Sequence, residues 1–133
     1  ALTNLKYFSS RDNLMAQLPL ELSGFTALHT IHVDRNRIVD VPPSMRKLTN
    51  LTILTLSDNC LKGTWRYFQI SSLPNLVELR LRGNQLQSPP MGVARLPKLK
   101  HFDWRPVLSA TEQLEQAALE SRATTPGGSN SET

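Results

Sequence analysis

The chain has 133 residues, of which 39% are hydrophobic and 20% are charged, and its formal net charge at pH 7 is +4. These values predict one folded domain and exclude a long disordered polar chain. No stretch approaches the roughly 20 apolar residues of a membrane-spanning helix, and no basic start followed by an apolar run indicates a signal peptide.

The cysteine content and the charge distribution restrict the environment and the partners. The single cysteine, Cys60, cannot form an internal disulfide, which favours a reducing compartment, the cytoplasm or the nucleus. Residues 110–133 carry a net charge of −3, which leaves +7 on the rest of the chain. This balance favours an acidic protein partner and is too weak to indicate nucleic acid, and nothing indicates a membrane partner.

Leucine recurs at fixed spacing along most of the chain. Steps of 23, 23, 25 and 23 residues separate the anchor leucines Leu5, Leu28, Leu51, Leu76 and Leu99. Apolar residues recur three and five positions after most anchors, which is the alternation of a short β-strand. Eight positions after the first four anchors stand Asn13, Asn36, Asn59 and Asn84. We expect these asparagines to bond backbone groups of their own and adjacent turns, forming a ladder.

This spacing, L-x-x-L-x-L-x-x-N-x-L across residues 2–109, resembles that of the leucine-rich repeat family. The resemblance is to the typical 23-residue, intracellular-type repeat. It implies an α/β fold: a solenoid coiled as a right-handed β/α superhelix, or horseshoe, with short parallel β-strands on its concave face. It also implies that a protein partner binds that face. We assign residues 1–109 to about five repeat units.

In chain order, the first element expected is an incomplete return segment. Leu2 stands where later returns carry an apolar residue three positions before the anchor. Since an uncovered end of a solenoid is a liability, this start suggests either a piece of a longer protein or a partner that covers the end.

The later returns should close the convex side with short helical or irregular turns. Pro19, Pro42 and Pro90 punctuate three of them, because proline fixes φ and lacks a backbone donor. The third return has two extra residues and no proline before Pro74. We expect a bulge there, with Trp65 and Phe68 either filling core volume or exposed as an aromatic contact.

The last repeat should lead into a cap. The fifth unit lacks the asparagine and places Trp104 in a core column. Residues 109–112, Ser-Ala-Thr-Glu, resemble a helix capping box, and residues 110–122 are expected to form a C-terminal capping helix. Its Leu114, Ala118 and Leu119 can face inward. Residues 123–133 have no large apolar residue and are expected to be a disordered tail.

Stacking in register predicts which outward side chains are neighbours on the concave face. Arg11 should lie beside Asp34, Arg35 between two aspartates, and Arg80 beside Asp103. Glu78 and His101 should also be adjacent. Arg82 and Arg105 are the exception, since their column places two like charges side by side without an acid.

We therefore predict that Arg80, Arg82 and Arg105 take an acidic or phosphorylated segment, because planar guanidinium groups suit carboxylate and phosphate. Alternatively, these arginines are solvated or meet the acidic C-terminal helix. The other candidate contact residues on the same face are Tyr7, Ile53, His32, Glu78 and His101.

The sequence does not predict an enzyme. No nucleotide-binding loop and no H-E-x-x-H motif is present, and no Cys/His cluster has zinc spacing, so no cofactor or metal is expected. The expected function is a protein–protein interaction scaffold or adaptor. The alternative is a recognition or autoregulatory segment of a larger signalling enzyme or an immune-type receptor. The fold alone does not name the partner.

Overall fold

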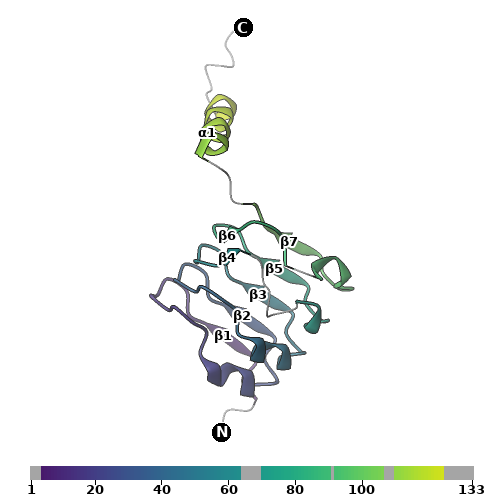
Figure 1. Cartoon of the computed structure of the whole chain (residues 1–133). Helices are drawn as coiled ribbons and strands as arrows, with labels where there is room; N and C mark the ends of the chain where they lie inside the picture. Colours follow the sequence, from purple (N-terminus) through teal and green to yellow (C-terminus); the bar gives the residue numbers. More distant parts are fainter. Residues whose placement is uncertain (1–3, 64–69, 91, 107–109, 125–133) are drawn as a thin grey trace.

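The computed structural model describes residues 4–63, 70–90, 92–106 and 110–124. Five three-residue strands form one parallel sheet in the order β1-β2-β3-β5-β7, with successive repeats lying side by side (Figure 1). The strands are β1 (Tyr7–Ser9), β2 (Thr30–His32), β3 (Ile53–Thr55), β5 (Glu78–Arg80) and β7 (His101–Asp103). A second, two-stranded parallel sheet pairs β4 (Lys62–Gly63) with β6 (Gln85–Leu86).

The register of the main sheet follows the repeat period. Three rows of aligned residues run across it: Tyr7, Thr30, Ile53, Glu78, His101; Phe8, Ile31, Leu54, Leu79, Phe102; and Ser9, His32, Thr55, Arg80, Asp103. The extra two residues of the third unit leave this register unchanged, since they fall in the return. The stacking in register predicted from the sequence is therefore confirmed for these three rows.

The core consists of the stacked leucine columns. The anchors Leu28, Leu51 and Leu76 are fully buried, as are the strand centres Ile31, Leu54 and Leu79. Each turn buries its apolar residues against the neighbouring turns, because no single repeat can enclose them. At the ends of the stack, Phe8 is only half-buried and Phe102 is exposed.

The returns close the opposite side with single turns of 3-10 helix, as expected. These turns are η1 (Leu20–Gly24), η2 (Pro43–Lys47), η3 (Ile70–Ser72) and η4 (Val93–Arg95). Pro19 and Pro42 directly precede the first two, where a missing N–H costs nothing. The expected bulge with Trp65 and Phe68 lies outside the described residues, as does Leu2.

In the main sheet, β1, β2, β3 and β5 each lead into a residue with left-handed backbone. Asp12, Arg35 and Asp58 have φ of 59°, 56° and 57°, and Gly83 has φ of 77°. At Gly83 space is also restricted, because a Cβ would lie 2.0 Å from Asp58 Oδ1 and 3.0 Å from Asp58 Cα. Glycine is therefore required at this fourth corner.

Replacing Gly83 by alanine is expected to lower the free energy of unfolding by about 1–3 kcal/mol, since the backbone conformation and the contact with Asp58 both oppose a Cβ. Urea unfolding followed by circular dichroism measures the change. Gly24→Ala is the matched control, because a Cβ there meets no atom within 4 Å. Equal stability of the two variants would contradict the prediction.

The C-terminal helix is present as α1 (Ala110–Thr124), ending two residues beyond the predicted bound. It does not pack on the last strand as the capping role requires. Leu114 is 73% exposed and Leu119 58%, and the helix stands off the end of the coil (Figure 1). The capping interpretation is therefore corrected: helix periodicity identified the element, but only a few isolated leucines mark an apolar side. Ser109 of the capping box and the expected tail from residue 125 onwards lie outside the described residues.

Candidate protein-binding face

The asparagine ladder determines how the strand ends are held. The Oδ1 atoms of Asn36, Asn59 and Asn84 accept the backbone N–H of Met15, Ile38 and Leu61 in the preceding turn, at 3.1, 3.0 and 3.0 Å. Their Nδ2 atoms donate to backbone carbonyls of both turns; for Asn59 these are Val33 and Leu56, each at 3.0 Å. Asn13 differs, because it is exposed and its hydrogen bonds within the described residues are to Ser10 and Arg11 of its own turn. The ladder prediction is thus right for three members, and Asn13 bonds its own turn.

A second set of side-chain hydrogen bonds joins neighbouring repeats at the opposite ends of the strands, and it was not predicted from the sequence. Asn50 Nδ2 donates to Thr26 O at 2.9 Å, and Asn75 Nδ2 to Thr49 O at 2.7 Å. Lys98 Nζ then donates to Asn75 Oδ1 at 2.8 Å. Asn50, Asn75 and Lys98 each directly precede an anchor leucine. This shared repeat position is the sequence signal from which the links could have been predicted.

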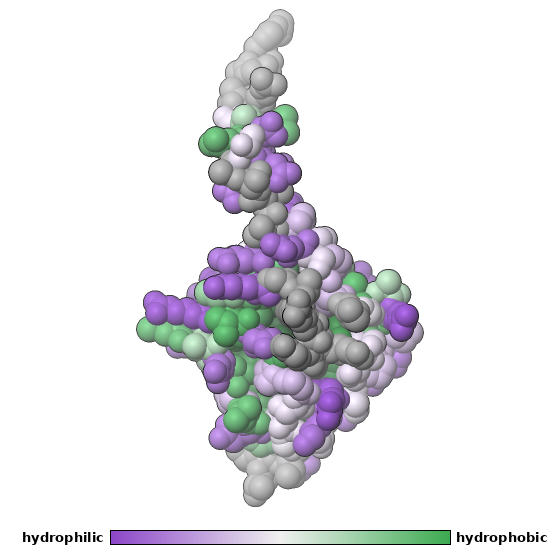
Figure 2. Space-filling model, viewed as in Figure 1, coloured by the Kyte–Doolittle hydropathy of each residue, from purple (hydrophilic) through white to green (hydrophobic). Residues whose placement is uncertain are grey.

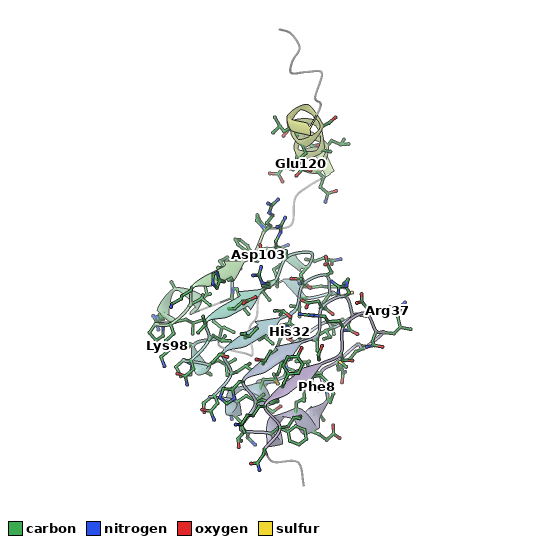
Figure 3. The ribbon with its side chains drawn as sticks, turned by 180° about the vertical axis from the view of Figure 1, so that it is seen from behind. Phe8, His32, Arg37, Lys98, Asp103 and Glu120 are labelled. Carbon is green, nitrogen blue, oxygen red and sulfur yellow. The ribbon has the colours of Figure 1, made fainter. Side chains whose placement is uncertain are left out.

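The concave face, formed by the first and third side chains of each strand and the residues just after them, divides into two halves. The half over β1, β2 and β3, here called the neutral half, carries uncharged groups at its strand positions, and the charges of Arg11 and Asp34 just after the strands pair with each other. Its strand residues are Tyr7, Ser9, Thr30, His32, Ile53 and Thr55. The half over β5 and β7 carries charges: Glu78, Arg80, Arg82, His101, Asp103 and Arg105. Figure 3 shows His32 over the strands and Asp103 at the end of the sheet nearer α1.

A hydrogen-bonded network holds the neutral half. Asp34, only 7% exposed, accepts Arg11 Nε at 3.0 Å, the Thr55 hydroxyl at 2.7 Å and the Ser57 backbone N–H at 2.9 Å. Thr55 Oγ1 lies 2.9 Å from His32 Nδ1. The predicted Arg11–Asp34 pair is therefore confirmed, and it belongs to a larger network.

His32 and Tyr7 form the surface above this network. Their rings meet edge to face with centroids 5.6 Å apart, and Tyr7 is 56% exposed. Burial, with a smaller contribution from the positive charge of Arg11, lowers the pKa of His32 below its ordinary value, while the carboxylates of Asp34 and Glu78 act in the opposite direction. Neutral imidazole is therefore favoured at physiological pH.

The charged half corrects one prediction. Arg82 Nε lies 3.4 Å from Asp103 Oδ1, so Arg82 does have an acidic neighbour, contributed by an adjacent column. Arg80 Nη1 lies 3.9 Å from the other oxygen of Asp103, and Arg80 Nε also pairs with Glu78. The register of the strands predicts neighbours within one column of equivalent residues. It does not predict the Arg82 contact, because an arginine side chain is long enough to reach a residue of the adjacent column.

Two further pairings complete the charged groups of this face. Glu78 and His101 are aligned neighbours in the sheet, as predicted. The Glu78 carboxylate pairs with Arg80 on its own strand. This pairing raises the pKa of Arg80 above its ordinary value, so its charge is constant. Arg105 is exposed and has no ion pair within the described part of the chain. The predicted pairing of Arg35 with Asp12 is confirmed at the side of this face.

The remaining surface offers little else for chemistry. Figure 2 shows apolar and polar residues interspersed over the face in view. A groove of about 240 Å³ between the first two returns includes Leu20, Val39 and Pro43. Within the described ranges no three His, Cys, Asp or Glu residues are grouped so that they could hold a metal ion. No described helix is long and apolar enough to cross a membrane.

The stacked parallel strands, the leucine core and the asparagine ladder define a leucine-rich-repeat solenoid. The family model described as "Leucine rich repeat" matches residues 26–86, and the chain belongs to this family. Among curated proteins it is similar to keratocan of Danio rerio, 32% identical over 95 residues that make up 70% of this chain and 27% of keratocan.

Two solved structures show the same fold. A leucine-rich repeat protein of Leptospira interrogans superposes with a TM-score of 0.70 and 32% identity, covering 89% of this chain and 30% of that one. The leucine-rich-repeat ectodomain of the receptor kinase SOBIR1 from Arabidopsis thaliana gives 0.64 and 25%, covering 77% and 56%. The chain thus spans about a quarter of keratocan and under a third of the leptospiral protein.

Proposed function

We propose that the concave face binds a protein segment that presents a carboxylate or phosphate to Arg80, Arg82 and Arg105, and that the chain serves as a scaffold or adaptor module. The family supports protein binding in general. The observation that carries the finer proposal is the charge balance of this corner. Three arginines stand against two carboxylates: Glu78 pairs with Arg80, and Asp103 lies between Arg80 and Arg82. Arg105 has no ion pair among the residues described.

A partner anion would complete this arrangement. A guanidinium group has five N–H donors, and each of these arginines uses few of them within the described residues. Their side chains are about half exposed, at 45% for Arg80 and 48% for Arg82. Planar donors on an open face suit bidentate contact with carboxylate or phosphate.

A recognition segment of a larger protein is the second candidate. It is supported by the small share of each relative that the chain covers and by the similarity to a receptor-kinase ectodomain. In either case we propose binding without catalysis. A cytoplasmic or nuclear location rests on the single cysteine alone, and the similarity to an ectodomain argues against it.

Charge reversal tests the arginine site. The probes are synthetic decapeptides that differ at one position, phosphoserine, aspartate or serine, with fluorescence anisotropy as the measurement. The wild-type chain is expected to bind the phosphoserine peptide more tightly than the serine peptide. Arg82→Glu with Arg105→Glu should weaken phosphopeptide binding by about a hundredfold or more, since two charged hydrogen bonds at about 1.5–3 kcal/mol each are lost.

The matched control reverses Arg46 and Arg95, which are exposed on the returns of the second and fourth repeats. This variant has the same change in net charge and should retain the affinity. An equal loss in both variants, or no loss in the first, would exclude the proposed arginine site.

A further inference from the structure

The protons of the network beneath His32 can be assigned from the hydrogen-bonding groups themselves. The Asp34 carboxylate, paired with Arg11, can only accept. Thr55 has a single hydroxyl proton, and its oxygen lies 2.7 Å from Asp34 Oδ2. The Thr55 hydroxyl must therefore donate to Asp34, and towards His32 its oxygen can only accept.

This assignment determines the state of the His32 ring. The 2.9 Å contact with Thr55 Oγ1 requires a proton on Nδ1. In the neutral ring Nε2 then carries no proton and is an acceptor. No residue in the described ranges forms a hydrogen bond with Nε2. The charged groups that act on the ring are Arg11, Asp34 and Glu78.

We propose that His32 Nε2 is a fixed hydrogen-bond acceptor on the concave face and that it binds a neutral hydroxyl or N–H donor of a protein partner, beside the exposed ring of Tyr7. Thr55 and Asp34 are positioning residues that hold the ring in this tautomer. Carboxylate and unprotonated phosphate groups are rejected at this point, since two acceptors repel each other. The inference rests on the proposed function only in that the partner crosses the same face.

The two halves of the face would then select opposite hydrogen-bonding groups. His32 is on β2 and Arg80 on β5, which are two strand spacings apart in the sheet. With about 4.8 Å between neighbouring strands, the acceptor and the arginine site are about 10 Å apart. A matching partner carries a neutral donor and an acidic group at that separation, and it can lie across the strands in one direction only.

The first test needs no ligand. Long-range ¹H–¹⁵N correlation spectra of the whole chain at neutral pH identify which imidazole nitrogen carries the proton. The expected result is a protonated Nδ1 and a bare Nε2 for His32. A predominantly Nε2-protonated or a fully charged ring would overturn the proposal, whatever the arginine site does.

The second test uses phenol and anisole as probes, which differ only in that phenol has a hydroxyl proton. Titration with phenol should shift the His32 Nε2 resonance, and phenol should bind about two- to tenfold more tightly than anisole, the range of one net hydrogen bond. His32→Asn is the matched variant, because its amide nitrogen can still reach Thr55 but it has no acceptor at the Nε2 position. In this variant both probes should bind equally. Equal affinities in the wild-type chain, or no shift of Nε2 with phenol, would overturn the proposed acceptor.

Discussion

Replacing Asn59 by alanine is expected to lower the free energy of unfolding by about 3 kcal/mol or more. Asn59 is buried and accepts the Ile38 N–H while donating to the carbonyls of Val33 and Leu56. Its removal leaves the buried Ile38 N–H without its acceptor, which costs roughly 1–3 kcal/mol. The two carbonyls each lose one of two amide donors, since Val33 also accepts from Asn36 and Leu56 from Asn84, at about 0.5–1.5 kcal/mol for each lost hydrogen bond. Urea unfolding followed by circular dichroism measures the loss.

Asn13→Ala is the control for this prediction, since it removes the same side chain at the equivalent repeat position. Asn13 is exposed, and in the described part of the chain it bonds Ser10 and Arg11, so water can replace its contacts. We expect a loss below about 1 kcal/mol. If both substitutions cost the same, the buried ladder does not hold the turns together.

The register of the sheet could be predicted because one physical constraint repeats. Every turn has to bury a leucine at the same point of the coil, so residues one repeat apart must stack. This is why Ile53 aligns with Thr30 and Glu78 despite the longer third unit. The ladder followed from the same constraint, except at Asn13, whose bonds within the described residues are to Ser10 and Arg11.

The parts of the site that were not predicted depend on side-chain reach and orientation. Arg82 contacts Asp103 across columns. Glu78 aligns with His101 as predicted, but its carboxylate also pairs with Arg80 on its own strand. The position of α1 also could not be read from its sequence, because a helix with few leucines does not identify the surface on which it packs. Spacing determines neighbouring backbone positions, but not which of several partners a long side chain selects.

Asp34→Ala is the second substitution expected to have a large effect, because it links the stability of the fold to the binding face. It leaves the Ser57 N–H and the Thr55 hydroxyl without their acceptor and frees Arg11. We expect a loss of about 2–4 kcal/mol in the free energy of unfolding. Because Arg11 is partly exposed, its pairing contributes the smaller share. Urea unfolding measures the loss.

Asp103→Ala is the control, since Asp103 also pairs with arginines but is more exposed, and its contacts are longer, at 3.4 and 3.9 Å. The decrease in the free energy of unfolding of Asp103→Ala should stay within about 1 kcal/mol. The two variants should also differ in the tautomer of His32. Without Asp34 the Thr55 hydroxyl is free to donate to Nδ1, so a proton on Nε2 becomes allowed and the fixed acceptor disappears, whereas Asp103→Ala leaves it in place. An unchanged His32 spectrum in a folded Asp34→Ala chain would show that the carboxylate does not set the tautomer.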